Sequence, residues 1–128
     1  MKHHMKNTVS LLMLFAGVLI ILTNCAYNIG LTQSMYKLLL TSQISYDTSM
    51  KIAASLYAKG EISTSDKTKI VEIGNIYSTA HNQAVVALAN YERTKSETDQ
   101  VRLTTQIEIA TKALSKLLEM LQPYLEVN

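Results

Sequence analysis

Apolar positions recur every three or four residues through most of the chain after residue 30, a spacing typical of amphipathic helices. The pattern predicts three helices, at about 31–59, 65–94 and 97–122. No stretch alternates apolar and polar residues long enough to predict a strand. The residues that share one face of the first helix are Leu31, Met35, Leu38, Ser42, Tyr46, Ala53 and Leu56 or Tyr57.

The second and third helices have more regular apolar faces than the first. The middle of the first helix, residues 41–49, is rich in Ser and Thr and is its weakest helical stretch. The face of the second helix carries Ile70, Ile73, Tyr77, Ala80, Ala84, Ala87 and Tyr91. The face of the third carries Leu103, Ile107, Ala110, Leu114, Leu117, Leu121 and Tyr124.

Local signals mark the ends of these helices. Lys59-Gly60 closes the first helix, because glycine readily takes the left-handed C-terminal position. Ser63 or Ser65 caps the start of the second helix, and Ser96 with Asp99 approximates a capping box for the third. Gly74 either admits a bulky neighbour or marks a bend, and Pro123 kinks or ends the third helix.

Three helices of similar length with short connections favour antiparallel neighbours. We therefore predict an all-α fold: an antiparallel, up-down-up three-helix bundle over residues 31–128, about 40 Å long at ~1.5 Å per residue. The near-heptad stripes favour a coiled-coil-like crossing of about 20°.

The N-terminal segment has the order of parts of a secretory signal. Lys2 and Lys6 precede an apolar run from Val9 to Leu22. As a helix this run would be about 21 Å long, shorter than the ~30 Å hydrocarbon core of a bilayer. Residues 1–25 are thus a cleaved signal or, extended through Tyr27, a retained signal-anchor helix, with 26–30 as a tether. Both alternatives export the rest of the chain, because the positive-inside bias keeps the lysines in the cytoplasm.

The string Leu22-Thr23-Asn24-Cys25 resembles the lipobox of bacterial lipoproteins. The resemblance implies that Cys25, the only cysteine, becomes the first mature residue and carries acyl chains. Asn24 departs from the small residue that this family has before the cysteine. The resemblance also implies a site on the periplasmic side of a bacterial envelope. Ala26, where an inner-membrane retention signal would have Asp, favours the outer membrane.

Charge and composition narrow the function. All ten acidic residues follow Cys25, as do ten of the twelve basic ones, so the exported part is close to neutral and offers no basic face for nucleic acid. His81 is the only histidine after Cys25, too few ligands for a transition-metal site. The four glycines are too dispersed for a phosphate loop. We expect no enzymatic activity, no cofactor, no metal and no small-molecule substrate.

We therefore expect a small envelope protein that acts by protein binding or structural support. Ile76, Val85, Val86 and Ile109 lie outside the predicted apolar faces and suggest more apolar surface than the core consumes. The predicted interaction face, for a second copy or a helical partner, is the third-helix stripe of Leu117, Leu118, Leu121 and Leu125. The alternative is a membrane-active, single-span protein that oligomerises, similar to a holin or small toxin and phage-derived.

Overall fold

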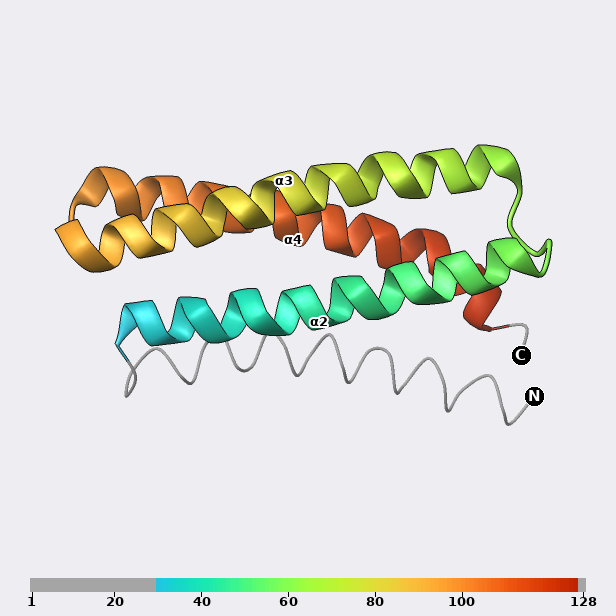
Figure 1. Cartoon of the computed structure of the whole chain (residues 1–128), viewed down its shortest axis with the longest axis horizontal. Coiled ribbons are helices and arrows are strands. Elements are labelled where there is room, and N and C mark those ends of the chain that lie inside the picture. The colour runs from blue at the N-terminus through green and yellow to red at the C-terminus, as the bar shows by residue number, and fades with distance from the viewer. Residues whose placement is uncertain (1–29, 127–128) are drawn as a thin grey trace.

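A computed structural model describes residues 30–126 of the chain as three long helices, α2 (Leu31–Ala58), α3 (Thr64–Thr94) and α4 (Glu97–Leu125). Residues 30–126 contain no strand. Successive helices run in opposite directions and pack side by side as a bundle (Figure 1). The all-helical prediction is confirmed, and the predicted helix ends agree with the structure to within one helical turn. The predicted signal or anchor (1–25) and most of the tether (26–30) lie outside the described residues.

The helix ends form as the local sequence predicts. Of the two candidate caps for α3 the structure selects Ser63, whose hydroxyl accepts a hydrogen bond from the Asp66 amide at 3.1 Å. Ser96 caps α4 in the same way, through the Asp99 amide at 3.2 Å. Gly60 ends α2 with a positive φ of 74°, a conformation that glycine adopts without steric cost.

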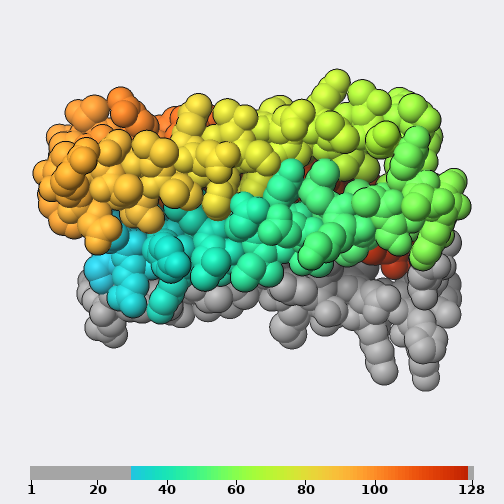
Figure 2. All heavy atoms as spheres, in the orientation of Figure 1, coloured from blue at the N-terminus to red at the C-terminus, as the bar shows by residue number. Residues whose placement is uncertain are grey.

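The closest packing in the bundle is between α3 and α4. Several of the residues buried between them are alanines, so the two backbones can approach each other: Ala80, Ala84 and Ala87 on α3, and Ala110 and Ala113 on α4. α2 lies along this hairpin and contributes Leu39, Ala53 and Leu56 to the core. Seen from the side in Figure 2, α2 and α3 form most of the coloured surface, and α4 is largely hidden behind them.

As predicted, the third helix ends near Pro123: α4 runs on for two residues, to Leu125. Proline removes one hydrogen bond from a helix, and its ring crowds the carbonyl four residues earlier, here that of Glu119. Tertiary contacts hold this turn in place. Leu121 is buried, and the Tyr124 hydroxyl donates a hydrogen bond to the Asp66 carboxylate of α3 at 3.0 Å.

Gly74 follows the first of its two predicted alternatives, a close approach by a bulky neighbour. A Cβ atom at this position would lie 3.0 Å from the Tyr46 hydroxyl and 3.4 Å from the Met50 Cε atom, both on α2. The missing side chain therefore lets α2 pack directly against the backbone of α3. This contact positions the polar seam described next.

Candidate functional site

A seam of polar and aromatic side chains joins α2 to α3. Tyr46 of α2 stacks on Tyr77 of α3 with the ring centroids 4.3 Å apart, and Tyr77 stacks in turn on His81 at 5.5 Å. The Tyr77 and Ser42 hydroxyls form a hydrogen bond across the interface. The Tyr46 hydroxyl donates to the Gly74 carbonyl and accepts from Ser78, both at 3.3 Å.

Tyr77 is the most deeply buried member of the seam, with a side chain that is fully inaccessible to solvent. Burial raises the pKa of its hydroxyl to about 12, and the hydrogen bond with Ser42 opposes this shift. A tyrosine with such a pKa stays protonated at neutral pH. It therefore acts here as a neutral hydrogen-bonding group and not as a proton-transfer group.

His81 is half-buried, and its Nε2 atom lies 3.0 Å from the Leu39 carbonyl oxygen of α2. This contact satisfies one ring nitrogen of His81 within the bundle. Nowhere in residues 30–126 do three His, Cys, Asp or Glu side chains come together as metal ligands would. The seam thus has the character of a structural element, because its polar groups satisfy one another.

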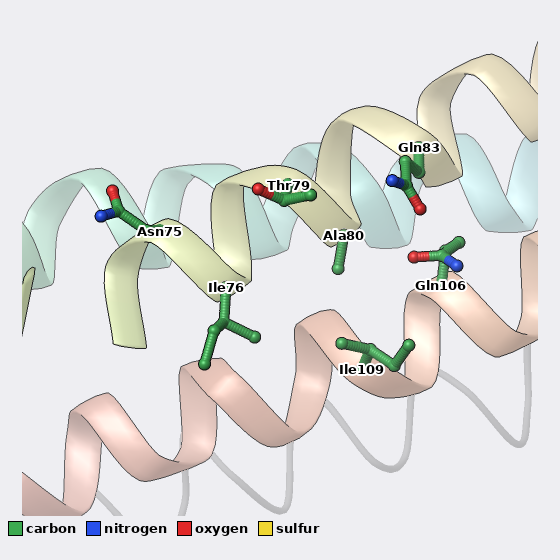
Figure 3. A pocket seen from close by; sticks show the side chains of 7 residues that line it. All are labelled: Asn75, Ile76, Thr79, Ala80, Gln83, Gln106 and Ile109. Carbon is green, nitrogen blue, oxygen red and sulfur yellow. The ribbon is translucent and has the colours of Figure 1, made fainter. Parts of the chain in front are cut away.

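A second candidate site is a shallow groove on the outer surface between α3 and α4 (Figure 3). Ile76 and Ile109 project into it from the two helices, over a floor that includes Ala80. Gln83 and Gln106 face each other across it. The remaining lining residues are Asn75 and Thr79.

The chemistry of the groove fits binding better than catalysis. Ile76 and Ile109 are 53% and 39% exposed, large values for apolar side chains that lie beside each other. The polar residues that line the groove are three amides and one hydroxyl, and none of them titrates near neutral pH. An apolar floor with amides at its edge can hold an apolar side chain and hydrogen-bond to the backbone or amides around it.

The prediction of a broad exposed stripe on the third helix is wrong for half of its members. Leu117 and Leu121 are fully buried and belong to the core with Leu56 and Ile70. Leu118 and Leu125 are half-buried. Leu117 and Leu121 are buried because α2 and α3 both pack against this end of α4.

The other expectation of surplus apolar surface is confirmed. Ile76, Val85, Val86 and Ile109 are all substantially exposed. The sequence did not indicate that Ile76 and Ile109 share a groove, since that depends on how α3 and α4 are rotated. It also missed the exposed Tyr36, Leu40 and Ile44 on α2, although their regular spacing of four was a usable signal.

The lipidation site predicted at Cys25 lies outside the described residues. Among the helices of residues 30–126, none combines the length and hydropathy that a membrane span needs. Comparison of the chain with protein-family models, with curated proteins and with solved structures finds no match. The function is therefore argued from the chain's own residues.

Proposed function

We propose that this chain is a non-enzymatic envelope protein, held at a membrane by its N-terminal segment, whose helical bundle binds another protein. The observation that carries the proposal is the α3–α4 groove, where Ile76 and Ile109 stay exposed between amide side chains. The helices around the groove are tightly packed through alanines, which gives a partner a rigid surface. The absence of a titratable group from its lining favours binding over catalysis.

The groove is tested by substitutions that place a charge in it. Ile76→Glu and Ile109→Glu should each abolish chemical crosslinking of the full chain to its partner in native membranes, because a carboxylate on an apolar floor loses its hydration. Val86→Glu is the matched control, since Val86 is an exposed apolar residue of α3 that does not line the groove. Equal crosslinking by all three variants would remove the groove from the proposal.

Membrane attachment rests on the signal-like N-terminus and on Cys25. The proposed cellular location is the periplasmic face of a bacterial envelope, at the outer membrane if the chain is lipidated. Protein isolated from native membranes should lack residues 1–24 and carry added mass that matches acyl chains. Cys25→Ser should then accumulate as an unprocessed precursor. A full-length, unmodified mass would favour the alternative, a retained single-span helix of the membrane-active kind.

A further inference from the structure

The outer face of α2 carries an exposed apolar stripe near its N-terminal end. Tyr36, Leu40 and Ile44 are 60%, 49% and 59% exposed. They are four residues apart, so they lie along one side of the helix over about 12 Å at ~1.5 Å per residue. The side of α2 that faces the core carries Leu39, Ala53 and Leu56 instead. α2 is therefore apolar on two opposite sides.

Exposed apolar patches commonly mark a contact with a protein or a membrane. Within residues 30–126, α3 and α4 cover only the inner side of α2, and the stripe stays exposed. We propose that the stripe lies on the surface of the bilayer to which the N-terminal segment attaches. This inference rests on the membrane attachment proposed above and adds to it the side of the bundle that faces the lipid.

The short connection between the N-terminal apolar run and α2 supports a lipid surface as the partner that covers the stripe. The apolar run ends at Leu22 and α2 begins at Leu31, so only residues 23–30 lie between them. Fully extended, this connection spans at most about 27 Å at ~3.4 Å per residue. The stripe occupies the next turns of α2. A membrane-held N-terminus thus keeps the stripe close to the bilayer at a high effective concentration.

The side chains around the stripe also fit an interface. Tyr36 has the amphipathic ring that is enriched at membrane–water boundaries. Lys37 lies three residues before Leu40 on the exposed side of α2 and can meet anionic headgroups. Asp47 follows the stripe on the exposed surface and accepts a hydrogen bond from Gln43. The carboxylate limits the lipid contact to the helical turns before it.

The test uses the full chain with Cys25→Ser, reconstituted into vesicles of phosphatidylethanolamine and phosphatidylglycerol. A single cysteine that carries a nitroxide replaces Leu40 or Ile44, and matched control labels replace Val86 and Val101. Both valines are exposed apolar residues on other helices, Val86 in the C-terminal half of α3 and Val101 near the start of α4. Labels at Leu40 and Ile44 should collide more often with oxygen than with a water-soluble nickel chelate. The control labels should show the reverse.

A companion variant carries the label at Tyr36 together with Leu40→Ser and Ile44→Ser. Its label should lose the preference for oxygen, while circular dichroism stays unchanged because both substituted side chains are exposed. Water-like collision rates at all four positions in chains that float with the vesicles would overturn the docking and leave the attachment intact. Chains that do not float would overturn attachment through a retained N-terminal helix, and the docking with it. Spin–spin broadening at Leu40 and Ile44 that grows with protein density would assign the stripe to a second copy instead.

Discussion

At the scale of single residues, Tyr77 is the buried centre of the seam between α2 and α3. It stacks on Tyr46 and His81 and hydrogen-bonds to Ser42. Burial of its hydroxyl favours the neutral form, whereas the hydrogen bond with Ser42 favours the ionised one. The packing of α2 on α3 therefore depends on the protonation of a single buried hydroxyl, that of Tyr77.

Tyr77 predicts a loss of stability at alkaline pH. Its folded pKa is about 12, whereas an unfolded tyrosine titrates near 10. Above pH 10 the unfolded state releases this proton first, so the stabilisation is complete below pH 10 and lost as the pH rises towards 12. The two-unit difference corresponds to roughly 3 kcal/mol. Urea unfolding should show a larger alkaline loss in the wild type than in Tyr77→Phe, and an equal loss in both would contradict the prediction.

Substitution of His81 should lower stability less than ionisation of Tyr77 does, and should leave partner binding unchanged. His81→Ala removes the side-chain contact to the Leu39 carbonyl at 3.0 Å and the ring that stacks on Tyr77. We expect a loss of about 1 kcal/mol in the free energy of unfolding. His81→Gln keeps a hydrogen-bond donor and should recover part of it. Unchanged partner crosslinking in His81→Ala would agree with the structural role, whereas its loss would indicate a binding role.

At the scale of elements, the start of α4 is fixed by a set of local hydrogen bonds. The Asp99 carboxylate accepts from Thr94 at 2.7 Å and from Ser96 at 2.9 Å, and the Ser96 hydroxyl accepts from the Asp99 amide. The two hydroxyl donors lower the pKa of Asp99. The turn and the cap are thus one unit, and it forms from residues close together in the sequence.

Ser96→Ala should lower the free energy of unfolding by about 1 kcal/mol, because the first turn of α4 loses its side-chain acceptor. Thr98→Ala, at an exposed position two residues later, is the control and should change little. Because the pKa of Asp99 is lowered on folding, its contribution is present at neutral pH and lost as the pH falls below about 4. Thermal unfolding at pH 7 and pH 3 should show that the Ser96→Ala deficit shrinks in acid.

At the scale of the whole molecule, the three helices are not held equally. α3 and α4 meet through a continuous line of buried alanines and leucines. α2 meets them partly through polar groups: Ser42, Ser49, Tyr46 and the contact of His81 with Leu39. Ser49 is buried and donates to the Ser45 carbonyl of its own helix, so it adds no bond between helices.

This difference predicts that α2 opens before the α3–α4 hairpin does. Native-state hydrogen exchange should show faster exchange in α2 than in the middle of α3 and α4, because local opening there exposes less apolar surface. Tyr77→Phe, which removes the bond to Ser42, should speed exchange in α2 more than in α4. Uniform exchange across the three helices would instead indicate that the bundle opens as one unit.

The sequence by itself determined the three helices and their ends. Periodicity and caps act between residues a few positions apart, so Ser96, Gly60 and the alanine face of α3 could be identified without the fold. The exposure of Ile76 and Ile109 could also be predicted, because they lie off the main apolar faces.

Only the tertiary structure decided which apolar faces stay covered and which polar groups meet. The sequence places Leu117 and Leu121 in a broad apolar stripe that could face a partner. In the structure, two neighbouring helices cover them. The stacking of Tyr46 on Tyr77, the space that Gly74 leaves for Tyr46 and the groove between Ile76 and Ile109 all depend on how the helices are rotated about their axes. Helix rotation is set by side-chain packing between distant segments, which a local pattern does not contain.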